Sequence, residues 1–164
     1  MGSLFLLLTG LALGAPEMIP ADAVEVIGRT APEMVLPTLD GGDFDLQKHR
    51  GKPVVLAFWA SWCGPCRAEL PELAELAKRR DDVAVFAVNV DREQRAAEMF
   101  MRQVAFELPV VWDNESQVMG QLDVTSMPTT FVIDAKGTIK WRKVGYSREK
   151  RLTELEAVLD GMVR

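Results

Sequence analysis

Two closely spaced cysteines are the residues of this sequence best suited to chemistry. Cys63 and Cys66 are the only cysteines of the 164-residue chain, and Gly64 and Pro65 separate them. A dithiol with this spacing can exchange electrons with a disulfide, because one thiolate attacks a disulfide sulfur and the second thiol resolves the mixed disulfide. The alternatives are a structural disulfide or half of a zinc site. Zinc takes four ligands, whereas the chain offers two cysteines and the single histidine His49, so we favour redox chemistry and expect no metal.

The segments on either side of the cysteines predict how they are presented. Residues 53–59 form a nearly unbroken apolar run, which indicates a strand buried on both faces. Residues 67–80 are strong helix formers with leucines three residues apart. We therefore expect Cys63 at the helix N-terminus, where free N–H groups and the helix dipole favour a thiolate. Cys66 would lie one turn on, on the same face, as the resolving thiol.

Three separated motifs resemble the thioredoxin superfamily. Residues 62–66, Trp-Cys-Gly-Pro-Cys, match the thioredoxin active-site pentapeptide, and Pro71 matches the proline that kinks its active-site helix. Residues 127–134 resemble the cis-proline segment, and residues 51–56 are most similar to the TlpA/ResA branch. That branch contains bacterial thiol-disulfide reductases that work outside the cytoplasmic membrane. The resemblance covers residues 28–162 and implies an α/β thioredoxin fold, in which helices flank both faces of a mixed sheet, with an N-terminal hairpin and a helical insertion.

The order of predicted elements agrees with that fold. The hairpin is expected within residues 31–46, around an Asp-Gly-Gly turn. Asp91 is a plausible N-cap for the inserted helix, whose Met99 and Met101 we interpret as core filler rather than metal ligands. The order βαβ, inserted helix, ββα places helices on both faces of a mixed sheet. Further strands are predicted at 83–90, 129–133 and 138–144, and further helices at 93–104, 114–122 and 148–162.

The Met127–Pro128 bond marks the expected substrate contact. An X-Pro bond adopts the cis form at little cost, and a proline has no N–H that could close a sheet ladder beside the sulfur of Cys63. A substrate segment could then pair with the exposed backbone of Met127. The alternative is an ordinary loop proline at a strand start. On this basis we expect the substrate-binding residues to be Trp62, Gly64, Pro65, Met127 and Pro128.

One departure from thioredoxin bears on proton transfer. Ala57 occupies the position at which thioredoxin carries a buried aspartate, so the role of that aspartate toward the second cysteine is vacant. Glu69 lies one turn beyond Cys66 and matches a glutamate of the ResA-type proteins. A partly desolvated carboxylate there would have a raised pKa and could accept the proton of Cys66 as a third catalytic residue. A solvated glutamate on the helix surface is the equal alternative.

The N-terminal residues suggest export. Residues 4–13 are almost wholly apolar, too short for a membrane helix of about twenty residues but typical of a signal-peptide core. No Lys or Arg precedes them, so a short apolar helix packed on the domain is the alternative. Residues 15–30 contain two prolines and predict a linker or loosely docked arm. We therefore divide the chain into an apolar segment with linker, 1–27, and a thioredoxin-like domain, 28–164.

These features predict an extracytoplasmic thiol-disulfide oxidoreductase that reduces protein disulfides. The resemblance implies a membrane-bound thiol donor and, as one substrate, the haem-attachment cysteines of apocytochrome c. We expect a monomer with no cofactor beyond the Cys63–Cys66 disulfide, and the net charge of −5 argues against a nucleic-acid partner. The alternatives are a peroxidase of the same superfamily, whose required cysteine position residues 53–66 do not supply, and a non-catalytic binding or chaperone module.

Overall fold

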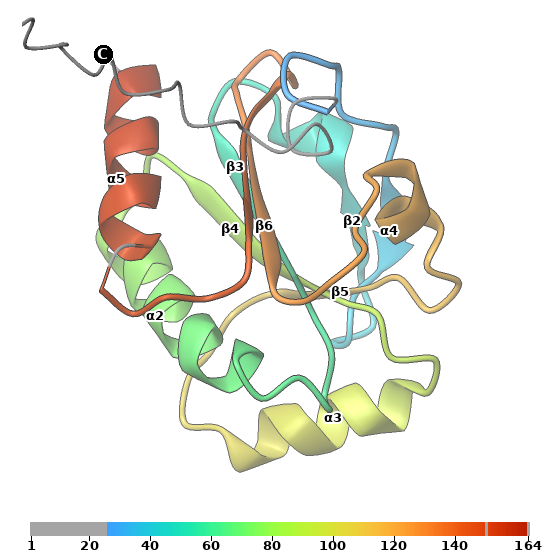
Figure 1. Cartoon of the computed structure of the whole chain (residues 1–164). Coiled ribbons are helices and arrows are strands. Elements are labelled where there is room, and N and C mark those ends of the chain that lie inside the picture. The colour runs from blue at the N-terminus through green and yellow to red at the C-terminus, as the bar shows by residue number, and fades with distance from the viewer. Residues whose placement is uncertain (1–25, 150, 164) are drawn as a thin grey trace, which may run out of the picture.

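A five-stranded mixed sheet with strand order β5-β4-β3-β6-β7 forms the centre of the protein (Figure 1). The computed structural model describes residues 26–149 and 151–163. The apolar run at residues 4–13 therefore lies outside the described residues. The strands are β1 (Val35–Pro37), β2 (Asp43–Asp45), β3 (Val54–Trp59), β4 (Ala84–Asn89), β5 (Val110–Trp112), β6 (Thr129–Ile133) and β7 (Ile139–Val144). The helices are the 3-10 helix η1 (Leu46–His49), α2 (Cys66–Arg79), α3 (Gln94–Gln103), α4 (Gln117–Gln121) and α5 (Arg151–Met162).

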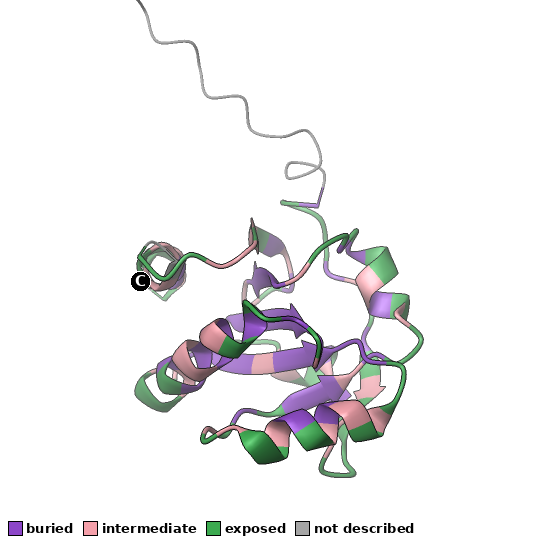
Figure 2. Ribbon diagram, turned by 60° about the horizontal axis from the view of Figure 1, so that its bottom comes forward, coloured by how far each residue is buried: buried purple, intermediate pink, exposed green. Residues whose placement is uncertain are grey.

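Strand β3 is the buried centre of this sheet, as its apolar run predicted. All six of its residues are buried, and it pairs parallel with β4 and antiparallel with β6. Figure 2 shows the central strands as mostly buried and the outer sides of the helices as exposed. Because β3 is hydrogen-bonded to a neighbouring strand on each side, its carboxyl end holds the following cysteine turn in a defined place.

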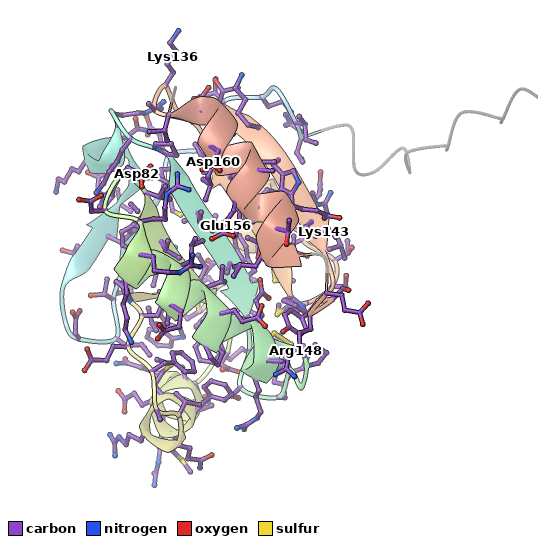
Figure 3. All side chains as sticks on the ribbon, turned by 90° about the vertical axis from the view of Figure 1, so that its left-hand side faces the viewer. Asp82, Lys136, Lys143, Arg148, Glu156 and Asp160 are labelled. Atoms are coloured by element: carbon purple, nitrogen blue, oxygen red, sulfur yellow. A yellow bond between two sulfur atoms is a disulfide. The ribbon has the colours of Figure 1, made fainter. Side chains whose placement is uncertain are left out.

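Helices cover both faces of the sheet, which confirms the predicted thioredoxin fold. Helices α2 and α5 lie side by side over one face, and α4 lies with the β1–β2 hairpin on the opposite side (Figures 1 and 3). Pro71 lies inside α2, where it removes one intrahelical hydrogen bond. No helix in the described part of the chain is long and apolar enough to cross a membrane.

The predicted N-terminal hairpin is present. The sequence after it predicts a loop with His49 at the surface, but the structure differs there. Strand β1 pairs antiparallel with β2 around the Asp-Gly-Gly turn, and η1 follows directly. His49 ends η1, is half-buried and packs between Phe44 of β2 and Phe86 of β4. These ring contacts between distant segments could not be inferred from the local sequence.

Two further expectations were wrong because tertiary contacts replaced the local ones. Asp91 does not cap the inserted helix, which begins at Gln94 after Glu93 in the N-cap position. Residues 26–30, expected in a loose arm, dock on β7 instead: the Gly28 N–H donates to the Ile139 carbonyl, and the Ile139 N–H donates to the Arg29 carbonyl. Val26 is consequently buried in the core.

Candidate active site

Cys63 and Cys66 form a disulfide at the start of α2. Their Cα atoms are 5.4 Å apart. The helix begins at Cys66, and Cys63 lies in the turn directly before it, next to the helix N-terminus at which we expected it. The Cys66 backbone N–H nevertheless donates to the Cys63 sulfur at 3.3 Å. A free N–H of the helix end is thus directed at Cys63, which is the arrangement that stabilises a thiolate.

The two sulfurs differ in their access to solvent. Cys66 is fully buried, whereas Cys63 retains 4% of its surface. Around Cys63 the chain is open, because Gly64 and Pro65 are exposed and Trp62 has 73% of its surface in contact with solvent. A partner can therefore reach the disulfide from the Cys63 side only. This asymmetry suits an attacking first cysteine and a resolving second one.

The predicted cis-proline segment and the cysteine turn share one groove. The Met127–Pro128 peptide bond is cis, as the sequence indicated. Pro128 is buried and its carbonyl accepts the Gly145 N–H at 2.8 Å, while Met127 is half-buried. Trp62 and Met127 line the same groove, together with Asp91, Met119 and Ser126. Of the five residues expected to contact a substrate, Trp62 and Met127 therefore line one groove, whereas Gly64, Pro65 and Pro128 are not among its lining residues.

Glu69 is buried, so its interpretation as a solvated surface glutamate was wrong. Only 2% of it is exposed, and its carboxylate accepts a hydrogen bond from the Thr130 hydroxyl at 2.6 Å. Thr130 pairs with Ala57 in the sheet. A carboxyl group therefore lies behind the disulfide although the strand beside it carries alanine.

Tyr146 is a residue near the site that the sequence reasoning missed. Its hydroxyl donates to Glu72 of α2 at 2.6 Å, one residue after Gly145 binds the Pro128 carbonyl. Burial, followed by the hydrogen bond to Glu72 and its charge, raises the pKa of Tyr146 above its ordinary value. This contact joins the segment after β7 to the cysteine helix. The one available signal was that this is the single tyrosine of the chain.

Metal ligands do not gather at this site. In residues 26–149 and 151–163, no group of three or more His, Cys, Asp or Glu side chains is placed to hold a metal ion. His49 lies in its aromatic cluster with Phe44 and Phe86.

Comparison with known proteins identifies the family. The model of the AhpC/TSA family matches residues 27–142. The chain belongs to this family. The thiol-disulfide oxidoreductase ResA of Geobacillus kaustophilus is 39% identical over 116 residues, which cover 70% of this chain and 67% of that relative. A solved candidate thiol:disulfide interchange protein DsbE from Chlorobium tepidum is 34% identical, with a TM-score of 0.75 and coverage of 81% of this chain and 97% of the other.

A third similarity concerns a surface protein. The exposed lipoprotein thioredoxin of Streptococcus pneumoniae is 29% identical, with a TM-score of 0.68 and coverage of 79% of this chain and 99% of the other. Together these similarities confirm the ResA-type resemblance. The AhpC/TSA family member described here is a thiol-disulfide oxidoreductase with a thioredoxin fold, and Cys63 and Cys66 form its disulfide pair.

Proposed function

We propose that this oxidoreductase reduces disulfides of other proteins outside the cytoplasm, with Cys63 as the attacking thiolate and Cys66 as the resolving thiol. The observation that carries the proposal is the position of the Cys63 sulfur, at the Cys66 N–H and on the exposed side of the disulfide. Stabilisation by the helix end would lower the pKa of the Cys63 thiol in the reduced protein, while burial keeps Cys66 away from other partners.

The exchange proceeds in two balanced steps. The Cys63 thiolate attacks one sulfur of the substrate disulfide, that S–S bond breaks, and the other substrate sulfur leaves as a thiolate. Cys66 then gives its proton to Glu69 and attacks the Cys63 sulfur, which re-forms the Cys63–Cys66 disulfide and releases the second substrate thiolate. Two electrons pass to the substrate. A thiol donor returns the protein to its dithiol form by the same exchange in reverse.

The groove determines how a substrate would lie. An extended segment would pair with the backbone at Met127, because the Pro128 nitrogen carries no hydrogen to compete for the sulfur. Its side chains would contact Trp62, Met119 and Met127, whose flexible or aromatic groups accept varied apolar partners. Exposed Gly64 and Pro65 leave room for the substrate cysteine. Such a surface suits unfolded or extended protein segments.

The family supports the proposed location, donor and substrate. A structural relative is named an exposed lipoprotein, and disulfide exchange of this kind serves proteins in oxidising compartments. A membrane-bound thiol donor would supply the electrons. Within the TlpA/ResA resemblance, we propose the oxidised haem-attachment cysteines of apocytochrome c as one substrate, with the protein acting as a monomer.

Insulin reduction by the purified protein, with dithiothreitol as donor, tests the proposal. Cys63→Ser should abolish the reaction, because the remaining thiol, that of Cys66, is fully buried. Cys66→Ser should accumulate mixed disulfides through Cys63, which mass spectrometry detects after alkylation. The double variant Cys63→Ser, Cys66→Ser is the matched control, and a non-catalytic chaperone would keep its activity in it. Full insulin reduction by Cys63→Ser would refute the assignment, and peroxide consumption in place of insulin reduction would favour the peroxidase.

A further inference from the structure

Asp91 carries a buried carboxylate that accepts hydrogen bonds from the turn before the cysteines and from the end of β4. It is 6% exposed. Its Oδ2 accepts the Ser61 backbone N–H at 2.9 Å, and its Oδ1 accepts the Ser61 hydroxyl at 3.0 Å. The Asn89 side-chain amide donates to Oδ2 at 2.8 Å. A buried carboxylate is costly unless donors surround it, so these three contacts specify where Asp91 and Ser61 must lie.

The backbone of Asp91 is itself anchored to the sheet. Its N–H donates to the Asn89 side-chain carbonyl at 3.0 Å, and the Trp112 indole N–H donates to its carbonyl at 2.7 Å. Asn89 ends β4 and Trp112 ends β5. The backbone of Asp91 is therefore held by the ends of β4 and β5, independently of the contacts that its carboxylate makes with Ser61. Because α3 begins only at Gln94, capping of that helix does not account for this arrangement.

We infer that Asp91 is a positioning residue for the reaction: it clamps the Ser61–Trp62 turn so that the Cys63 sulfur stays at the Cys66 N–H. Ser61 precedes Cys63 by two residues, and the Cys63 N–H closes the turn on the Ala60 carbonyl at 3.0 Å. The same turn presents Trp62 to the groove that Asp91 also lines. The Asp91 carboxylate thus positions both the Cys63 sulfur relative to the Cys66 N–H and Trp62 relative to the groove.

Loss of the Ser61 contacts and loss of the Asp91 charge should change the Cys63 pKa in opposite directions. Loss of the clamp loosens the donor at the Cys63 sulfur, which disfavours the thiolate and raises the Cys63 pKa. Loss of a nearby negative charge alone would lower that pKa. The other charged groups around the turn are Arg92 and Glu93 in the groove and Arg67 and Glu69 on α2, and they remain in every variant below.

The test measures the pH dependence of iodoacetamide alkylation in a Cys66→Ser background, where Cys63 is the single thiol. Asp91→Ala should slow alkylation at pH 7 by about three- to tenfold, as a pKa increase of up to about one unit requires. Ser61→Ala, which removes one of the two Ser61 contacts, should shift the profile in the same direction by less. Asp91→Asn, which keeps an acceptor oxygen, should recover part of the rate. The matched control is Asp81→Ala, an exposed aspartate before the opposite end of β4.

Each outcome decides the proposal. The clamp is overturned if the pH profiles of Cys63 alkylation in Asp91→Ala and Ser61→Ala equal that of the control. It is also overturned if Asp91→Ala and Asp91→Asn lower the Cys63 pKa equally, because loss of the charge alone would then explain the result. Should Asp91→Ala fail to fold, Ser61→Ala and Asp91→Asn still give the answer. The inference rests on the proposed role of Cys63, but its failure is distinguishable: an ordinary thiol pKa of Cys63 in the Cys66→Ser protein itself would refute that role rather than the clamp.

Discussion

Glu69 illustrates how one residue on a helix can combine packing with chemistry. The buried residues of the first turns of α2 are Cys66, Glu69, Leu70 and Leu73, which is the spacing of a single helix face. Glu69 therefore occupies a core position, and its hydrogen bond from Thr130 supplies the partner that a buried carboxyl requires. Since Cys66 shares this face one turn earlier, Glu69 is placed to exchange a proton with the resolving thiol.

Glu69→Gln should slow insulin reduction at neutral pH by about tenfold or more, because an amide cannot accept the Cys66 proton. The defect should lessen as the pH rises toward the ordinary thiol pKa of about 8.5, where Cys66 loses its proton without help. Rates measured from pH 5.5 to 9 would show this change of profile. Glu75→Gln on the exposed side of the same helix is the control. Parallel profiles for Glu69→Gln and the unmodified protein would remove Glu69 from the mechanism.

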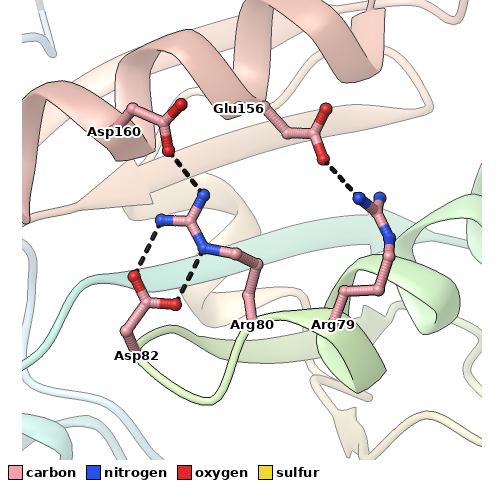
Figure 4. A network of polar contacts seen from close by, with 5 residues as sticks. All are labelled: Arg79, Arg80, Asp82, Glu156 and Asp160. Carbon is pink, nitrogen blue, oxygen red and sulfur yellow. Dashed lines mark hydrogen bonds and ion pairs between the residues drawn. The ribbon is translucent and has the colours of Figure 1, made fainter.

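At the scale of elements, α2 is fixed to α5 by a polar network at the end of α2 far from the cysteines (Figure 4). Arg80 binds Asp82 through two nitrogens at 2.8 Å each and Asp160 of α5 at 2.7 Å. Arg79 pairs with Glu156 at 2.9 Å. The hydrogen bond from Arg80, with its charge, lowers the pKa of Asp82. Figure 3 shows Arg148 at the opposite end of α2, where it approaches Glu72.

Arg80→Ala should lower the free energy of unfolding by about 1 kcal/mol or less, as expected for a partly exposed network, and should leave insulin reduction unchanged. Arg79→Ala should cost less, because the Arg79 side chain is 52% exposed and that of Arg80 is 18% exposed. The pKa of Asp82 is lower in the folded protein than its value of about 3.9 in the unfolded chain. The stabilisation from the Arg80–Asp82 pair is therefore present above about pH 3.9 and is lost as the pH falls through the folded pKa. Urea denaturation at pH 7 and pH 3 measures it. A loss from Arg80→Ala that is as large at pH 3 would contradict the ion-pair origin.

The elements also show what sequence reasoning could reach. The strand at 129–133 and the buried strand before the cysteines were predicted because period and composition are local properties. Asp91 was misassigned because a carboxylate after a strand has the same local signature whether it caps a helix or binds a distant turn. The burial of Glu69 did have a signal, namely a charged residue at a core position of a helical repeat. The docking of residues 26–30 on β7 had none, since the partner lies more than a hundred residues away.

At the scale of the whole molecule, His49 lies where the N-terminal hairpin meets the central sheet. The ring centroid of His49 is 5.4 Å from that of Phe44 and 4.8 Å from that of Phe86, so one cluster joins β2, η1 and β4. Burial, followed by the charge of Lys52, lowers the pKa of His49, and the charge of Asp45 opposes this only in part. The neutral ring is therefore the form that holds the hairpin on the core.

This cluster makes the stability of the molecule dependent on pH in a defined window. The unfolded chain takes up a proton at His49 near pH 6.5, whereas the folded protein does so only at lower pH. Between these values the unfolded state binds more protons, so the stabilisation is complete above about pH 6.5 and declines as the pH falls toward the folded pKa. Since His49 is the single histidine, no other histidine shares the window, and His49→Phe keeps an aromatic ring without the titration. The difference in unfolding free energy between the two proteins should therefore change between pH 7.5 and pH 5.5 in favour of His49→Phe, as urea denaturation can measure. A difference that stays constant over this range would show that His49 titrates alike in the folded and unfolded chains and that its ring is not held in the neutral form.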